Sequence, residues 1–247
     1  MRRYDHLFFD LDHTLWDFET NSRLAMQQTI LELKLESQII DFEQFIHYYE
    51  QINSQLWELF RKQEIRKPEL IRQRFEQTLS HFEIHGTDPM VMNDHYLKRM
   101  PLQKKLYPGV IETLEHLQQK GYQMHIITNG FTEVQHQKIE SSGLSPYFQR
   151  VFISEEIQAP KPDKRIFQYA LSSCNAKKER SIMIGDSWES DIVGARNFGI
   201  SQIFIDNTGS FPQKTNTPPL KNSFIKTSPP KNTTHIIKSI KELTQLL

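Results

Sequence analysis

The chain has 247 residues, and its 30 basic residues balance 30 acidic ones, so the formal net charge is zero. This length allows one large domain, or a domain with a smaller companion. A neutral chain has no global attraction for nucleic acid or an anionic membrane, and we expect neither as a partner. The mean hydropathy of −0.58 and the lack of any apolar run of roughly 18 to 20 residues predict a soluble protein.

The N-terminal region and the cysteine content predict a compartment. Cys174 is the single cysteine, so the chain cannot form an internal disulfide. The apolar run at residues 7–9 is three residues long, whereas a secretory signal needs about seven or more. Both observations predict a cytoplasmic protein.

Residues 18–99 predict a helical block. The first proline is Pro68 and the first glycine is Gly86, so strong helix breakers are absent from the first 67 residues. Apolar residues recur at helical spacing, with one stripe at 42–52 and another formed by Leu24, Ile30, Leu31 and Leu35. Breaks are expected near 37–41, 66–68 and 85–89, which gives about four helices.

From Pro101 onward, short apolar runs alternate with helical patterns. This alternation is typical of an α/β domain with a largely parallel sheet. Gly121, Gly143 and Gly199 are predicted helix ends, and Ser187 is a predicted N-cap. The candidate strands are residues 6–9, 124–127, 151–153, 181–184 and 202–205, followed by a short strand and a closing helix within 235–247.

The helical block separates the first candidate strand from all the others. We therefore predict a Rossmann-like parallel sheet flanked by helices, with a core domain of residues 1–17 and 101–247 and an α-helical cap of residues 18–100 inserted after the first strand. The segment 207–234 contains five of the twelve prolines and is rich in Asn, Thr and Lys. It is predicted to be a long surface excursion, with a role that its composition does not assign.

Polar residues follow several of the candidate strands, where ligands bind in open parallel sheets. Asp10 and Asp12 follow the first strand, Thr128-Asn129-Gly130 the second and Asp186 the fourth. Two acids behind an apolar run lose hydration and repel each other, which favours a cation beside them. Helix capping would by itself explain Asp186, an ordinary turn would explain Thr128, and Lys161 alone reads as a solvated lysine. Only their combination indicates a site.

Four stretches carry that combination in order: "DLDHT", "TNG", "KPD" and "GDSWESD". They resemble the four signatures of the haloacid dehalogenase-like superfamily of phosphatases. The resemblance covers residues 1–17 and 101–206, and the helical block falls where that family has its cap. It implies a hydrolase that transfers a phosphoryl group to an aspartate.

The resemblance implies a role for each matching residue. Asp10 is the expected nucleophile, which becomes a transient aspartyl phosphate. Asp12 is the expected general acid and base, and Lys161 offsets the charge of Asp10 and of the phosphate. The phosphoryl oxygens are expected to bind Thr128, the backbone amides of Asn129 and Gly130, and Lys161.

The resemblance also implies a magnesium site. The expected ligands are the carboxylates of Asp10 and Asp186 and the backbone carbonyl of Asp12, with Asp191 supporting Lys161 or an outer-shell water. Oxygen ligands without a His or Cys cluster favour Mg²⁺ as the cofactor.

Several reactions share this core. Asp12 argues against dehalogenation, because a halide leaves without a proton whereas an alcohol needs one. Phosphonate hydrolysis through a cap lysine (Lys34, Lys62 or Lys67) stays open. A closer resemblance, carried by "FFDLDHTLWDFETNS", "YPGV" and "THIIKSIKEL", is to pyrimidine 5′-nucleotidases. We therefore expect a pyrimidine nucleoside 5′-monophosphate as substrate. A sugar-phosphate or phosphoglycolate phosphatase, a phosphomutase and a non-catalytic binding module are the alternatives. The sequence assigns neither a base preference nor an oligomeric state.

Overall fold

The computed structural model describes residues 3–207 and 234–247, so the predicted surface excursion falls almost entirely outside the described residues. The chain divides into two compact units. An α/β unit contains Met1–Asp17, Leu106–Phe131 and Leu144–Leu247, and a helical unit contains Phe18–Lys105 and Thr132–Gly143. Among the described residues, no helix combines the length and the apolar character needed to cross a membrane.

A six-stranded sheet with the order β3-β2-β1-β4-β5-β6 forms the centre of the α/β unit. All neighbouring strands are parallel, which confirms the predicted fold class. Every residue of β1, β4 and β5 is buried, as expected for strands covered on both faces. The strands are β1 (His6–Phe9), β2 (Gln123–Thr128), β3 (Arg150–Ile153), β4 (Ser181–Gly185), β5 (Ser201–Ile205) and β6 (Thr234–Ile237).

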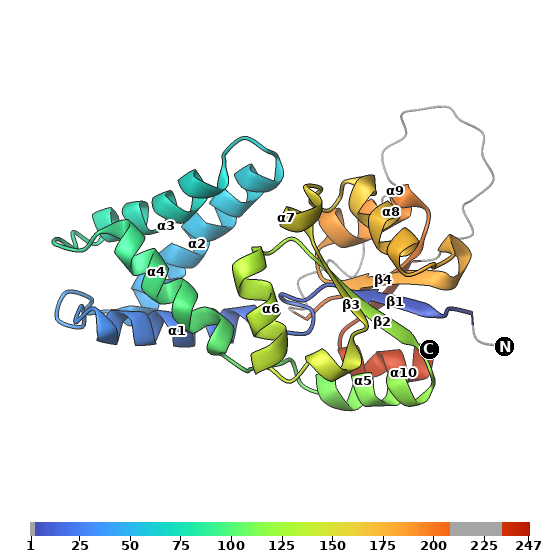
Figure 1. The fold of residues 1–247 in the computed structure, drawn as a ribbon. Coiled ribbons are helices and arrows are strands. Elements are labelled where there is room, and N and C mark those ends of the chain that lie inside the picture. The colour runs from blue at the N-terminus through green and yellow to red at the C-terminus, as the bar shows by residue number, and fades with distance from the viewer. Residues whose placement is uncertain (1–2, 208–233) are drawn as a thin grey trace, which may run out of the picture. The chain divides into compact units, whose positions relative to one another are not determined.

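Helices cover both faces of this sheet. In Figure 1, α5 and α10 lie on one side of the strands, and α8 and α9 lie on the other. The helix ends at Gly121 and Gly199 adopt positive φ, which glycine reaches without strain. The helices of the unit are α5 (Val110–Gln119), α7 (Ser154–Ile157), α8 (Lys164–Ser173), α9 (Gly194–Phe198) and α10 (Leu243–Leu246), with short 3₁₀ turns at Ser145–Tyr147, Lys178–Arg180 and Ile240–Glu242.

The segment after β4 differs from the single helix that the sequence predicts. Ser187 does cap it, because its hydroxyl accepts a hydrogen bond from the Ser190 N–H at 3.2 Å. The first part, Trp188–Val193, is however a π-helical turn, and α9 begins only at Gly194. The wider turn directs the Asp191 side chain inward, since Asp191 is fully buried. Turns of this kind are frequent at functional sites.

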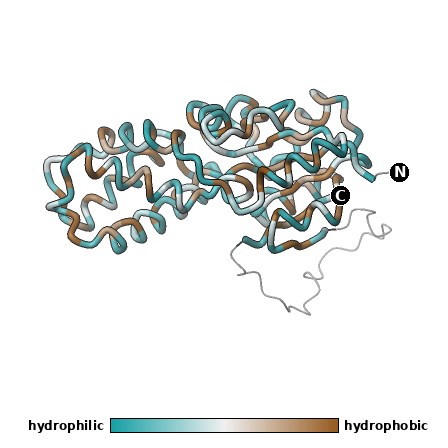
Figure 2. The backbone as a smooth tube through the Cα atoms, turned by 90° about the horizontal axis from the view of Figure 1, so that it is seen from below, coloured by the Kyte–Doolittle hydropathy of each residue, from teal (hydrophilic) through white to brown (hydrophobic). Residues whose placement is uncertain are grey.

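The helical unit contains the four helices that the spacing of breakers predicts, and a fifth from later in the chain. In the predicted apolar stripe of α2, Phe45, Ile46 and Tyr49 are buried, whereas Phe42 and Ile52 are partly buried. Figure 2 shows the corresponding alternation of hydropathy along these helices. The helices are α1 (Phe18–Glu32), α2 (Phe42–Arg61), α3 (Lys67–His81), α4 (Pro89–Arg99) and α6 (Thr132–Ser141), with a 3₁₀ turn at Met100–Leu102.

The buried face of α1 is more polar than predicted. Leu31, assigned to its apolar stripe, is 59% exposed, whereas Ser22 and Thr29 are buried. These polar side chains have partners: the Ser22 and Tyr96 hydroxyls lie 2.9 Å apart, and Thr29 donates to the Ala25 carbonyl at 2.8 Å. The predicted stripe of α1 is therefore wrong at Leu31, and the buried face also includes polar side chains because hydrogen bonding lets polar groups enter the core.

The boundary between the two units also differs from the predicted one. Helix α6 was assigned to residues 101–247 of the core, but it groups with the helical unit, which extends to Lys105. Its Ser141 hydroxyl donates to the Pro101 carbonyl, and its Lys138 ammonium lies 5.4 Å from the centre of the Phe18 ring. These contacts join segments that are distant in the sequence, so sequence spacing could not reveal them.

A buried arginine lies in the core of the helical unit. Arg74 is 3% exposed and donates to the side-chain oxygens of Asn53 at 3.4 Å and Asn93 at 2.5 Å. Its guanidinium also lies 5.3 Å and 5.5 Å from the ring centres of Phe75 and Tyr96. Within the part of the chain that the structure describes, no carboxylate pairs with it. Amide oxygens and aromatic faces are what compensate the lost hydration of this cation.

Candidate active site

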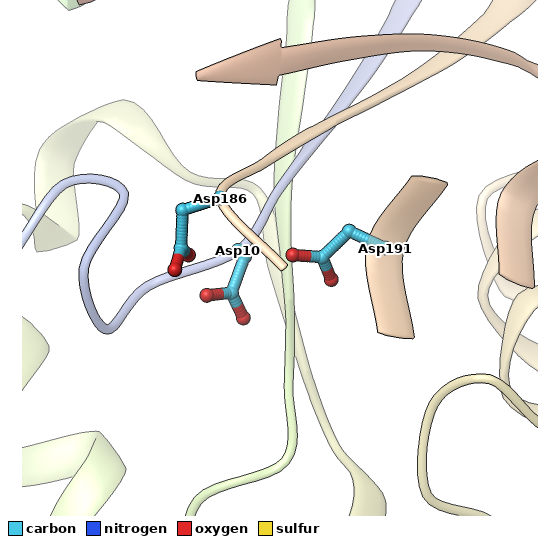
Figure 3. Close-up of side chains that lie close together, drawn as sticks. All are labelled: Asp10, Asp186 and Asp191. Atoms are coloured by element: carbon cyan, nitrogen blue, oxygen red, sulfur yellow. The ribbon is translucent and has the colours of Figure 1, made fainter. Parts of the chain in front are cut away.

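Three aspartates converge at the carboxyl ends of the central strands of the sheet. Asp10 follows β1, Asp186 follows β4, and Asp191 lies in the π-helical turn (Figure 3). A carboxylate oxygen from each lies within 4.8 Å of the other two. Asp191 is fully buried and Asp10 is 8% exposed. The sequence predicted the first two as metal ligands and placed Asp191 in support, whereas the structure brings all three carboxylates together.

Lys161 lies among these acids. Its ammonium donates to Asp10 Oδ1 at 2.5 Å and to the Ile127 carbonyl at 2.8 Å, and it lies 2.7 Å from Asp191 Oδ1. The side chain is 2% exposed. Burial alone would lower the pKa of Lys161, but the carboxylates of Asp10 and Asp191 outweigh it and raise the pKa above its usual value. Lys161 is therefore a permanent cation at the centre of the site.

One lysine does not compensate three closely spaced acids, of which Asp10 and Asp191 are buried and Asp186 is partly exposed. Burial, together with the neighbouring Asp191, raises the pKa of Asp10 to about 7 against the opposing effect of Lys161. Burial and the neighbouring Asp10 raise the pKa of Asp186 to about 6, and burial also raises the pKa of Asp191. The cluster thus favours a further positive charge. Because its donors are all carboxylate oxygens, the residues fit a hard divalent cation such as Mg²⁺.

Thr14 holds Asp186 in place, a role that the sequence analysis missed. Its hydroxyl donates to Asp186 Oδ1 at 2.8 Å and accepts from the Asp186 N–H at 3.1 Å. Thr14 is itself fully buried. The sequence offered no hint of this contact beyond the position of Thr14 in "DLDHT", because Asp186 is 172 residues away.

A glycine at the end of β4 makes room for Asp191. A Cβ atom at Gly185 would overlap the Asp191 carboxyl group. The second oxygen of this carboxylate, Oδ2, accepts from the Ser187 N–H at 3.1 Å. Gly185 and Ser187 together fix Asp191 beside Lys161, which fits the supporting role expected for Asp191.

Thr128, Asn129 and Gly130 lie at the end of β2, as predicted. The Gly130 N–H donates to Thr128 Oγ1 at 3.2 Å, so in this arrangement that amide already has a partner within the turn. The Asn129 side chain forms two hydrogen bonds with the backbone of Lys161. The predicted role in phosphate binding concerned the backbone of Asn129, and the role of its side chain was missed.

The loop behind β1 carries Asp12 and His13. Asp12 forms a β-bridge with Trp16, and the His13 N–H donates to the Trp16 carbonyl at 3.0 Å. His13 adopts a positive φ of 63°, which is uncommon for a residue with a side chain, and its carbonyl accepts from Asn207 Nδ2 at 2.6 Å. Asp12 does not belong to the cluster of three carboxylates.

The haloacid dehalogenase-like hydrolase family matches residues 4–199, which is most of the chain. The protein belongs to this family, and it is therefore a hydrolase.

Individual relatives are consistent with that membership. The chain is 35% identical to the pyrimidine 5′-nucleotidase PynA of Streptococcus pneumoniae over 202 residues, 81% of this chain and 83% of that protein. It is 31% identical to a glyceraldehyde 3-phosphate phosphatase of Pyrococcus furiosus over 208 residues, 83% of this chain and 81% of that protein. The solved structure of the HAD-hydrolase YfnB from Bacillus subtilis, bound to magnesium, superposes with a TM-score of 0.82 at 24% identity and covers 99% of each chain.

Proposed function

We propose that this hydrolase is a magnesium-dependent phosphatase that cleaves pyrimidine nucleoside 5′-monophosphates through an aspartyl phosphate on Asp10. The observation that carries the proposal is the position of Asp10, which is buried, bonded to Lys161 and close to Asp186 and Asp191. Lys161 favours the ionised, nucleophilic form of this carboxylate against the effect of burial, and a cation in the cluster would favour it further. The matching relatives named for phosphatase activities support this choice of reaction.

The reaction has two steps in which bonds and protons balance. In the first, a carboxylate oxygen of Asp10 attacks phosphorus, the bond from phosphorus to the ester oxygen breaks, and the Asp12 carboxyl group protonates the leaving alkoxide. In the second, the Asp12 carboxylate removes a proton from water, and the oxygen of that water attacks phosphorus and displaces Asp10. Lys161 compensates negative charge in both steps. We assign the proton transfer to Asp12 because its carboxylate is not one of the three clustered carboxylates.

The residues that would hold magnesium are the carboxylates of Asp10 and Asp186 and the backbone carbonyl of Asp12. The cation would neutralise phosphoryl charge and polarise the P–O bonds. Asp191 would hold Lys161, because its Oδ1 lies 2.7 Å from the lysine ammonium. Thr128 and the adjacent amides of Asn129 and Gly130 would receive the phosphoryl oxygens. The Gly130 amide would then exchange its bond to Thr128 for one to substrate.

The substrate class is the finer part of the proposal. The relative with 35% identity over most of the chain is named for pyrimidine nucleotides, which favours a nucleotide here too. A sugar-phosphate substrate is the second candidate, favoured by the relative named for glyceraldehyde 3-phosphate. Both are small phosphate monoesters, so the same core residues would act on either. We keep the cytoplasm as the proposed compartment, where such metabolites occur.

Phosphate release from a panel of esters tests this proposal. The panel contains UMP, dUMP, dTMP, CMP, AMP, glyceraldehyde 3-phosphate and phosphoglycolate, each measured with 5 mM MgCl₂, a concentration of roughly 100-fold excess over a mid-micromolar dissociation constant. Pyrimidine nucleotides are expected to give the highest kcat/KM, and EDTA is expected to abolish release. Faster hydrolysis of the sugar phosphates would overturn the nucleotide assignment alone. Release that EDTA leaves unchanged would overturn the metal-dependent mechanism.

A further inference from the structure

The side chain of Asn129 reaches across to the segment that carries Lys161. Its Nδ2 donates to the Lys161 carbonyl at 2.9 Å, and its Oδ1 accepts from the Lys161 N–H at 2.8 Å. Both backbone polar groups of one residue are thus bound by one side-chain amide. The two residues are 32 positions apart in the sequence, so the contact joins two separate loops of the α/β unit.

The chemistry of this contact is selective for asparagine. A planar carboxamide presents one acceptor and one donor side by side, which matches the N–H and C=O of a backbone residue. Aspartate would offer two acceptors and no donor, and serine would reach only one of the two groups. Glutamine has the same amide on a longer side chain and would displace the segment. We call these two hydrogen bonds the Asn129 clamp; among these four side chains, only asparagine can form both of them at position 129.

The backbone of Lys161 benefits from such a restraint, because the ammonium at the end of its long side chain contacts the Asp10 carboxylate. A lysine side chain is a flexible stem of four carbons, and its ammonium here is hydrogen-bonded to Asp10 and to the Ile127 carbonyl. The next residue, Pro162, is held as well, since its Cα lies 3.0 Å from where a Cβ on Gly194 would stand. The Asn129 clamp acts on Lys161 itself. The backbone position that it sets determines where the ammonium meets the Asp10 carboxylate.

We infer that Asn129 is a positioning residue that acts through Lys161, by fixing the backbone from which this lysine reaches Asp10 and the phosphoryl group. The inference rests on the proposed function, because it assigns Lys161 a part in phosphoryl transfer. It adds a role for the Asn129 side chain that is separate from binding phosphate through its backbone amide. A misplacement of about 1 Å in such a group lowers catalysis by up to about 100-fold.

A double-mutant cycle tests whether Asn129 acts through Lys161. The variants are Asn129→Ala, Lys161→Met and the double variant, measured on the best ester of the panel with Mg²⁺. Asn129→Ala is expected to lower kcat by about 10- to 100-fold with a smaller change in KM. In the Lys161→Met background the same substitution should change kcat by less than about twofold, because the group that it positions is gone.

The control variant is Asn197→Ala, which removes an exposed asparagine of α9 in the same unit and should leave kcat unchanged. Equal losses from Asn129→Ala in both backgrounds would overturn the inference, since Asn129 would then act independently of Lys161. Circular dichroism and thermal unfolding show whether each variant folds. If Lys161→Met does not fold, the crystal structure of Asn129→Ala decides: a displaced Lys161 ammonium supports the inference, and an ammonium still bonded to Asp10 contradicts it.

The same crystal structure separates this inference from the proposed function. If the unsubstituted protein releases phosphate from no ester, the proposed function fails, and the position of the Lys161 ammonium in Asn129→Ala still shows whether Asn129 positions it. If the unsubstituted protein is an active phosphatase and Asn129→Ala retains full activity, the inference fails and the proposed function stands.

Discussion

The two units each bury a cation, and they compensate it in different ways. In the α/β unit, Lys161 contacts the carboxylates of Asp10 and Asp191, and Asp186 adds a third acid nearby. In the helical unit, the guanidinium of Arg74 donates to the amide oxygens of Asn53 and Asn93 and lies near the rings of Phe75 and Tyr96. The first arrangement carries surplus negative charge, which costs stability unless a ligand offsets it. The second sets only partial charges against the cation, and the buried Nε of Arg74 has no hydrogen-bond partner among the described residues.

This difference suggests that the charged cluster of the α/β unit serves catalysis, whereas the surroundings of Arg74 serve stability. A surplus of clustered acid suits the proposed binding of a cation and a phosphate, whereas a hydrogen-bonded arginine among aromatic rings holds helices together. Substitutions in the α/β cluster should therefore change turnover more than stability. Substitutions around Arg74 should do the reverse.

The largest expected effect is that of Asp10→Asn. Loss of the proposed nucleophile should lower kcat by at least about a thousandfold, because the amide cannot attack phosphorus. Thermal stability should be kept or increased, since the substitution removes a buried acid whose pKa is raised to about 7. Phosphate release and thermal unfolding measure the two effects. The matched control is Asp94→Asn on an exposed face of α4, and activity that survives in Asp10→Asn would place the nucleophile elsewhere.

The next effect is on stability and comes from Arg74→Ala. The substitution leaves the buried oxygens of Asn53 and Asn93 without their donor and opens a cavity between Phe75 and Tyr96, at a cost of about 3 kcal/mol in the free energy of unfolding. Urea denaturation measures it. The control is Arg72→Ala on the same helix, where an exposed pair with Glu76 contributes about 0.5 kcal/mol or less. An equal decrease in the free energy of unfolding for the two variants would show that the buried contacts of Arg74 contribute no more than an exposed ion pair.

Magnesium should stabilise the protein, and more so at higher pH. Without a metal, the pKa of Asp10 is about 7 and that of Asp186 about 6, both above the usual 3.8. The folded protein then holds protons that the unfolded chain has released, so its stability falls as the pH rises from about 4 to 7. A bound cation replaces those protons. At a hundredfold excess over its dissociation constant, Mg²⁺ should add about 2.7 kcal/mol.

Thermal unfolding with and without EDTA measures this effect, and the shift at pH 8 should exceed the shift at pH 5. Asp186→Asn should reduce the shift, whereas Asp94→Asn should keep it. A shift that is equal at both pH values would contradict the assignment of these acids to the metal.

The smallest expected effect concerns a histidine that is remote from the proposed chemistry. His125 is 2% exposed, stacks on Phe8 at 5.0 Å, and its ring nitrogens lie 3.2 Å from His6 Nδ1 and 3.5 Å from Cys174 Sγ. Burial, His6 and Arg150 together lower the pKa of His125 to about 4. The unfolded chain therefore binds a proton below about pH 6.5 that the folded protein refuses, and stability falls as the pH drops from 6.5 to 4.

Replacing His125 with phenylalanine should remove that loss, which amounts to about 2 kcal/mol at pH 5. The measurement is the free energy of unfolding at pH 5 and pH 7 for the parent and for His125→Phe. A change at the exposed His85, His85→Gln, serves as the control and should leave the pH dependence of the parent. A His125→Phe variant with the same loss between pH 7 and pH 5 would show that other groups cause it.

Much of the fold could be predicted because its signals are local. Strand β1 appears at His6–Phe9 as expected, and β4 exceeds its predicted range by a single residue, since continuous apolar runs between turn residues are typical of strands buried on both faces. The four helices of the block begin and end near the expected breaks for the same reason. The prediction that Leu31 is buried is wrong, because helical periodicity cannot tell which polar residues of α1 will find partners.

For the candidate site as well, some features could be predicted from the sequence and others could not. The sequence alone determined which residues stand behind each strand, because "DLDHT", "TNG", "KPD" and "GDSWESD" place acids, a turn and a lysine at strand ends, where a parallel sheet brings them together. Only the tertiary structure decided what each side chain contacts. Asn129 binds the backbone of Lys161, Thr14 binds Asp186, and α6 packs in the helical unit. A hydrogen bond depends on tenths of an ångström between loops that are far apart in the chain, and that distance is set by packing rather than by local pattern.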